Sequence, residues 1–509
     1  MVGPDYRKAE VQVPASFKEG VEWQRADANP QAAISSTWWR MYGDDRLNGL
    51  VEQALQANQS IAAAEAAYRV ALGIVEANRA SLFPVATVGL SGARSGGNIV
   101  GLAGAAGGAT TAGVGAGNSV VADGSLSWEL DLWGQIRREI ESAKESAQAS
   151  DAQLAGERIS IAASVATDYF QLRQADFDVQ ALRQQQDLYG RILSMVQTGF
   201  AQGSASGDDV LNAQENLEVV IADLQTTETT REQDEHAIAV LTGTPPGAFS
   251  IPVDPDYRFA VPAVPLALPS QLLERRYDVV SAERTAAAAN ANIGVAEAAF
   301  FPTLTLSAQG GFAHNTLAHL FTAPSRFWTL GPDLAATIFD GGARTAAVHQ
   351  ARATYDEDVA NYRNTVLTAF QSVEDSLSSM NHLRAQESAF ANVLTSSSRL
   401  FASEQAQFDA GAVSQQNVLT QQLTLIQAQQ NLRDTQALLA ESNVMLVKNL
   451  GGGWPGADSD AAVSPLTSPN TSPNTSQTAA VNPGAPASPP VASPLSENAV
   501  RPAMQRAAD

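Results

Sequence analysis

The chain offers few residues for catalysis or metal binding. It contains five histidines and no cysteine in 509 residues. Only His314 and His319 lie close together, and a five-residue spacing in a loop matches zinc-ligand spacing poorly. The sequence has neither a G-x-S-x-G nucleophile motif nor a G-x-x-x-x-G-K-S/T phosphate loop. We therefore expect no enzymatic activity, no cofactor and no metal.

A glycine and a serine instead recur at matching positions in the two halves of the chain. The set Phe200, Gly203, Ser206, Val210, Leu211 and Gln214 is repeated 208 residues later as Phe408, Gly411, Ser414, Val418, Leu419 and Gln422. A glycine near a helix end can take the left-handed conformation, and a serine three residues later can cap the next helix. The repeat therefore predicts two tight turns between long helices.

The segments that must hold these turns are long and free of helix breakers. Residues 343–410 contain no glycine or proline, and apolar residues recur every seven positions at Val359, Val366, Val373 and Met380. At about 1.5 Å per residue such a helix would reach roughly 100 Å, so its seam must pack against other long helices. Matching seam residues occur 208 positions earlier, which predicts an internal duplication.

This duplication gives the expected domain organisation. We expect an extended N-terminal arm at 1–43, a first repeat at 44–243, a proline-rich linker at 244–269, a second repeat at 270–450, and a disordered tail at 451–509. Each repeat should hold a helix, a β-hairpin and a long helical hairpin. The β-hairpins are expected at about 84–133 and 302–340, and the helical hairpins at about 135–241 and 343–450.

Charge and hydropathy limit the partners of the chain. A net charge of −22 argues against binding to nucleic acid, which is itself an anion. No segment approaches eighteen consecutive apolar residues, so no helix is expected to span a bilayer. If the β-hairpins span a membrane, four strands are too few to close a barrel, and the chain must oligomerise. Two chains would supply eight strands and three would supply twelve, and the sequence alone does not choose.

Several motifs together point to a known family. They are Val2-Gly3-Pro4-Asp5-Tyr6, Trp38-Trp39-Arg40, Phe83-Pro84, Leu130-Asp131-Leu132-Trp133-Gly134, Leu241-Thr242-Gly243, Phe301-Pro302, Ile338-Phe339-Asp340-Gly341-Gly342 and the paired Gly-x-x-Ser turns. Over residues 2–450 the chain resembles the outer membrane factor family, in its NodT- and OprM-type branch of efflux lipoproteins related to TolC. The resemblance implies a mainly α fold with a small β part. It implies a homotrimer whose 12-stranded β-barrel, with four strands per chain, contacts outer-membrane lipid and continues into a long α-helical coiled-coil tunnel through the periplasm.

The same resemblance implies a function and partners. The chain would be the passive exit duct for drugs or other small molecules in a tripartite efflux system. It would dock to a periplasmic adaptor (membrane fusion) protein and to an inner-membrane pump of the resistance-nodulation-division (RND) class. The adaptor-facing residues would be those of the two tip turns, Gly203, Ser206, Gly411 and Ser414. The tryptophans Trp128, Trp133 and Trp328 would lie at the membrane interface, although tryptophans of this kind also occur in ordinary cores. The exported substrates cannot be read from the chain.

The resemblance also places a periplasmic gate beside the tips. Its candidate residues are Asp208 and Asp209 in the first tip and Gln415 and Gln416 in the second. If both aspartates faced the lumen of a trimer, six carboxylates would gather in a ring, repel one another and favour cations. Alternatively, the pair stabilises the first turn of a helix through its dipole, worth about 0.3–1 kcal/mol for each residue. Both interpretations stay open at this point.

Two further alternatives concern function and location. The same fold could serve as the outer duct of a type I protein-secretion system, and a structural coiled-coil protein of the envelope would need no aromatic-ended hairpins. Members of this branch carry a signal peptide and a lipid-bearing cysteine just before the Val2–Tyr6 segment. The printed sequence starts at Met1 and has no cysteine. The resemblance therefore implies a lipid anchor near the N-terminus if the native chain begins upstream of Met1.

Overall fold

The computed structural model describes residues 1–14, 16–20, 35–98, 114–264 and 276–454. All of them belong to one compact unit, Met1–Ser459. The expected disordered tail lies outside the described residues from position 455 onward, whereas Gly451 and Gly452, which were expected to belong to it, are buried. None of the helices in the described ranges is long and apolar enough to cross a membrane.

The four longest helices confirm the internal duplication. Helices α3 (Gln135–Ala201) and α7 (Ala343–Asp409) each have 67 residues. Their partners α4 (Gly207–Leu241) and α8 (Gln415–Asn449) each have 35. Corresponding ends lie 208 positions apart, the spacing found in the sequence. Each repeat therefore contributes one long helical hairpin of the same dimensions.

The first helix expected in each repeat differs between the copies. In the first repeat it is two helices, α1 (Asp45–Ala57) and α2 (Gln59–Ala80), and not the single helix expected. Asn58 separates them because its backbone is extended and its side-chain oxygen accepts hydrogen bonds from the amides of Ser60 and Ile61, which caps α2. In the second repeat the counterpart α6 (Tyr277–Ala298) has 22 residues, as α2 does.

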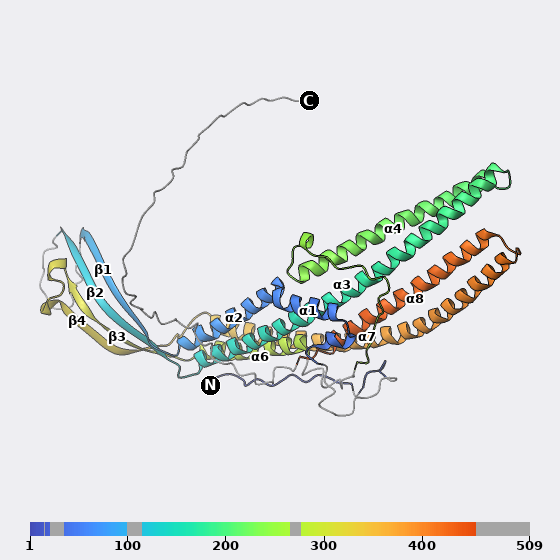
Figure 1. Cartoon of the computed structure of the whole chain (residues 1–509). Coiled ribbons are helices and arrows are strands. Elements are labelled where there is room, and N and C mark those ends of the chain that lie inside the picture. The colour runs from blue at the N-terminus through green and yellow to red at the C-terminus, as the bar shows by residue number, and fades with distance from the viewer. Residues whose placement is uncertain (15, 21–34, 99–113, 265–275, 455–509) are drawn as a thin grey trace, which may run out of the picture. The chain divides into compact units, whose positions relative to one another are not determined.

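The long helices lie side by side in a layer. Near the tips α3 packs between α4 and α8, and α8 packs against α7 (Figure 1). In the other half α3 packs against α2 and α6, and α6 packs against α7. The predicted seam of α7 is fully buried at Val366, Val373 and Met380. Toward the tip its positions Leu394 and Phe401 are only half-buried, so the core narrows in that direction.

The four strands form one antiparallel sheet in the order β1-β2-β3-β4 (Figure 1). The strands are β1 (Val85–Asn98), β2 (Val114–Leu130), β3 (Thr303–His314) and β4 (Arg326–Ala335). The two expected hairpins thus join through β2 and β3. The glycine-rich residues 95–98 and 114–118 continue the first hairpin as strand. Strand β4 ends at Ala335, and the segment up to Gly342 leads into α7.

The arm and the linker both pack on the helices. The Arg138 side chain is almost fully buried and donates hydrogen bonds to the carbonyl oxygens of Val2 and Gly3. In the proline-rich linker, Ile251 and Val264 are buried in the main core. The described part of this linker is therefore a fixed part of the body and not merely a connection between the repeats.

Candidate functional site

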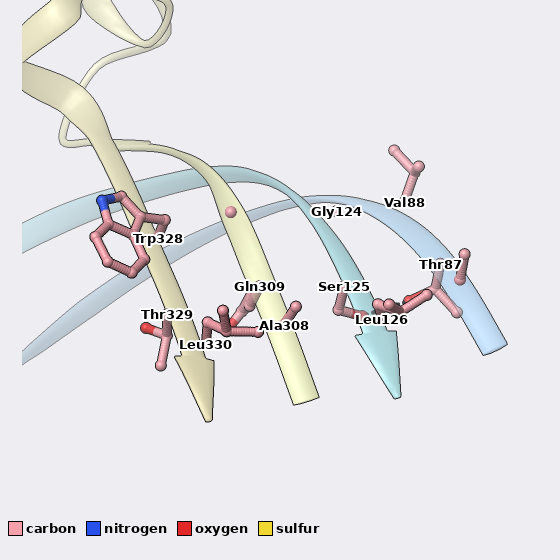
Figure 2. A pocket seen from close by; sticks show the side chains of 12 residues that line it. Thr87, Val88, Gly124, Ser125, Leu126, Ala308, Gln309, Trp328, Thr329 and Leu330 are labelled. Carbon is pink, nitrogen blue, oxygen red and sulfur yellow. Dashed lines mark hydrogen bonds between the residues drawn. The ribbon is translucent and has the colours of Figure 1, made fainter. Parts of the chain in front are cut away.

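Strand pairing sorts the sheet into an apolar face and a polar face. One cross-strand row consists of Val88, Gly124, Gly310 and Trp328, and a second of Ala86, Leu126, Ala308 and Leu330. The row between them consists of Thr87, Ser125, Gln309 and Thr329. Because successive residues of a strand point to opposite faces, the first two rows share one face and the middle row occupies the other. Figure 2 shows these twelve side chains on all four strands.

No other described part of the chain covers the apolar face. Val88 is 93% exposed, Trp328 77% and Leu330 72%. A shallow hollow of about 490 Å³ is lined by residues of all three rows. An apolar surface that spans a whole sheet is typical of contact with lipid or with another protein.

The polar face carries its own side-chain hydrogen bonds. The Thr87 and Ser125 hydroxyls lie 2.6 Å apart, and the Gln309 amide donates to Asp123 at 2.9 Å. Among the described residues β1 pairs only with β2 and β4 only with β3, so both outer strands present unpaired backbone groups. Such open edges require a partner, because unpaired N–H and C=O groups are costly away from water.

The three predicted interface tryptophans lie at different places on the sheet. Trp128 and Trp133 lie at the end that joins the helices, where their ring N–H groups donate to the carbonyl oxygens of Leu82 and Pro302. Trp133 also stacks on Phe301, with ring centroids 4.7 Å apart. Trp328 is instead the third residue of β4, close to the β3–β4 connection.

Two further aromatics, which were not among the predicted interface residues, lie at the helical end of the sheet. Phe83 is 67% exposed and Phe339 is 88% exposed. Both lie in the connections between helices and strands, and both belong to motifs of the family resemblance. The Phe83-Pro84 pair after α2 and the Ile338–Gly342 motif before α7 were the signals that could have shown them.

An aspartate and an arginine fix each strand-to-helix junction. Asp131 accepts hydrogen bonds from the backbone and side chain of Arg137 at the start of α3. At the start of α7, Asp340 makes the equivalent bonds to Arg344. The Arg344 side chain, together with the amides of Gly342 and Arg344, lowers the pKa of Asp340 to about 2. These pairs set the direction in which each long helix leaves the sheet.

The two tip turns have the predicted caps. Gly203 and Gly411 both have φ of 74°, in the left-handed region that favours glycine. Ser206 and Ser414 are the N-caps of α4 and α8. At each of the two glycines an added Cβ would meet nothing within 4 Å, so the requirement for glycine is one of backbone conformation and not of space.

The candidate gate residues are all exposed at the tips. Asp209 completes a capping box, because its carboxylate accepts from the Ser206 amide at 2.8 Å while its own amide donates to the Ser206 hydroxyl. The Ser206 backbone bond lowers the pKa of Asp209. In the second tip Asn417 takes the corresponding position and bonds Ser414. The S-x-x-D pattern from Ser206 to Asp209 was the sequence signal for the capping role of Asp209.

A two-faced open sheet joined to a layer of long helical hairpins defines a subunit of a TolC-like channel. The Campylobacter jejuni CmeC outer membrane channel matches with a TM-score of 0.79 and 25% identity, over 90% of this chain and 96% of CmeC. The outer-membrane channel OprN matches with a TM-score of 0.77 and 27% identity, over 89% of this chain and 99% of OprN.

The chain belongs to the outer membrane efflux protein family, whose model matches residues 50–244 and 268–452. The probable efflux pump outer membrane protein TtgC of Pseudomonas putida KT2440 is 30% identical over 459 residues, which cover 89% of this chain and 92% of TtgC. The pyoverdine export outer membrane protein OpmQ of Pseudomonas aeruginosa PAO1 is 33% identical over 457 residues, which cover 87% of this chain and 93% of OpmQ.

Proposed function

We propose that this protein is the outer-membrane channel of a tripartite RND-type efflux system, a passive exit duct for small molecules. The observation that carries the proposal is the sorting of the central rows of the sheet into an apolar and a polar face, with two open edges among the described strands. A sheet of this kind suits a barrel wall with lipid on one side and water on the other. The names of the relatives TtgC and OpmQ, which specify efflux or export, favour small-molecule efflux over protein secretion.

A homotrimer suits the exposed edges of the chain. Three copies would pair β4 of one chain with β1 of the next and give a closed 12-stranded barrel. In the tip half the outer helices α4 and α7 carry exposed apolar side chains, among them Leu211 and Val219 on α4 and Val393 and Leu400 on α7. Contact between α4 and α7 of neighbouring chains would cover such residues and extend the layer into a periplasmic tunnel.

A lipid anchor near the N-terminus is compatible with the position of the arm. The Val2 amide donates to the Trp133 carbonyl oxygen at 3.0 Å, beside the aromatics at the helical end of the sheet. A residue just before Val2 would therefore lie near the proposed membrane interface, within reach of an acyl chain inserted in the bilayer.

We propose that the tip turns contact the periplasmic adaptor. Substitutions in these turns test this contact. Valine at Gly203 and Gly411 would be forced into left-handed backbone, which costs roughly 1–2 kcal/mol per turn. We expect drug export by cells that also produce an RND pump and its adaptor to fall about 5- to 30-fold, with trimers still in the outer membrane.

The matched control for the tips is Gly190→Ala. Gly190 lies inside α3, and a Cβ there would meet nothing within 4 Å, so export should stay at the wild-type level. Normal export by the Gly203→Val, Gly411→Val double variant would show that the tip turns are not the surface that binds the adaptor. Absence of export by the wild-type chain with every RND pump tried, but export with a type I exporter, would reject the proposed function itself.

At the proposed gate the two aspartates are expected to behave differently. Asp209→Asn should reproduce the arrangement of Asn417 in the second tip and leave ion selectivity unchanged. Asp208→Asn should lower the cation preference of single channels in planar bilayers, because three exposed carboxylates would leave the ring. An unchanged preference in Asp208→Asn would assign both aspartates to helix capping and leave Gln415 and Gln416 as an uncharged gate.

A further inference from the structure

A row of amides and carboxylates joins α3 to α8, the helices through which the two repeats meet near the tips. Gln174 donates hydrogen bonds to Asp178 at 2.9 Å and to Asp434. Gln430 donates to Asp178 at 3.1 Å, and Gln185 donates to Gln430 at 2.7 Å. We name these five residues the polar seam. It crosses the boundary between the two helical hairpins, so any movement of one hairpin against the other must strain or break it.

The environment of the polar seam changes the pKa values of its two carboxylates. Burial and the nearby Asp178 carboxylate raise the pKa of Asp434 to about 7. Burial also raises the pKa of Asp178, while hydrogen bonds from Gln174 and Gln430 oppose this effect. The Gln174 side-chain oxygen is buried without a hydrogen-bond donor. A proton on Asp434 would supply a donor that this oxygen can accept after the amide turns over.

The charged groups around the seam also have shifted pKa values. On the same helices and on α4 stand Asp168, Asp234 and Glu441, and burial raises the pKa of each, to about 6 for the two aspartates. Gln171 donates to Glu441, and Asp168 and Glu441 each feel the charge of Asp234. These three carboxylates therefore also hold protons more tightly than usual.

The nearby arginines are engaged elsewhere. Arg173 and Arg231 both bond Asp176, which lies about 200° around α3 from Asp178 at 100° per residue. Arg433 of α8 donates to the Tyr257 carbonyl oxygen in the linker, and its guanidinium lies over the Phe177 ring. These guanidinium groups therefore bind Asp176 and the linker, and not the carboxylates of the polar seam.

We propose that the polar seam is a proton-dependent latch between the two helical hairpins. With a proton on Asp434 it holds α3 against α8. With both carboxylates ionised, two negative charges face each other across the seam, and the tip halves of the hairpins separate more readily. The consequence for opening of a channel rests on the proposed function, whereas the latch itself concerns only the contact between α3 and α8.

The direction of the pH effect follows from the raised pKa. The folded seam keeps a proton that the unfolded chain loses near the ordinary aspartate pKa of 3.8, so stability falls as pH rises from about 4 to about 7. Closing the latch is therefore favoured under mildly acidic conditions. Above about pH 7 the seam has lost its proton, so a further increase in pH lowers the stability of the folded chain only a little.

Hydrogen exchange of the full-length chain in detergent tests the latch. Amide protection factors, corrected for the pH dependence of chemical exchange, would be compared at about pH 5.5 and pH 8 in peptides covering 179–198 of α3 and 416–429 of α8. We expect protection in the wild type to be about three- to tenfold higher at the lower pH. Asp434→Asn, which is neutral at both values, should show high protection throughout, and Asp178→Asn should do the same.

The matched control is Asp223→Asn, an exposed carboxylate on α4 in the same half of the layer. It should keep the pH response of the wild type. Equal protection of the wild type at both pH values would overturn the latch, as would a wild-type pH response in both seam variants. Because no transport is measured, either result is independent of the efflux proposal.

Discussion

Replacing Leu330 by arginine is expected to remove most of the protein from the outer membrane. Leu330 lies in an apolar row of the sheet and is 72% exposed. A cation on the lipid face of a membrane barrel costs about 2–4 kcal/mol at the midplane. In a trimer the change occurs three times, so the cost reaches about 6–12 kcal/mol per assembly. The amount of assembled trimer in isolated outer membranes should fall by at least about tenfold.

The neighbouring residue provides a matched control for this change. Thr329 precedes Leu330 on β4 and belongs to the polar row with Gln309. Thr329→Arg adds the same side chain to the same strand on the opposite face, where water would solvate it, and trimer levels should stay near those of the wild type. Comparable losses in both variants would show that the apolar face is not the lipid surface.

Replacing Asp176 by alanine should cause the largest loss of stability in the helical part. This carboxylate is fully buried and accepts hydrogen bonds from Arg173 at 2.9 Å, Arg231 at 2.7 Å and the Asp254 amide at 2.9 Å. It thereby joins α3 and α4 to the linker. Removing one member of a buried ionic group leaves uncompensated charge, at a cost of about 3–5 kcal/mol. Hydrogen exchange in α4 and in residues 249–261 should accelerate by roughly two to three orders of magnitude.

An exposed ion pair on the same helix gives the comparison. Asp187 bonds Arg191 at 2.8 Å, and both side chains are 60% exposed. Asp187→Ala should cost no more than about 0.5 kcal/mol, because water screens the pair. Slow exchange in Asp176→Ala, equal to that of Asp187→Ala, would mean that the buried arginines find other partners and that the carboxylate does not tie the linker to the helices.

The sequence by itself determined the features that depend on local spacing. The 208-residue repeat predicted two helical hairpins of equal length, and Gly203 with Ser206 predicted a capped turn, because helix periodicity and capping act within a few residues along the chain. Family motifs likewise predicted the channel class. The break at Asn58 was missed, because an apolar pattern that continues through a cap hides the change of direction.

Only the tertiary structure decided how distant segments combine. Alternation along single strands could not show that Ala86, Leu126, Ala308 and Leu330 form one row, since this depends on the register between strands from both repeats. The polar seam is similar: Asp178 and Asp434 are ordinary helix-surface residues in the sequence, 256 positions apart. The pKa of Asp434 is raised only because packing of α3 on α8 partly shields this carboxylate from water and brings the Asp178 charge near it.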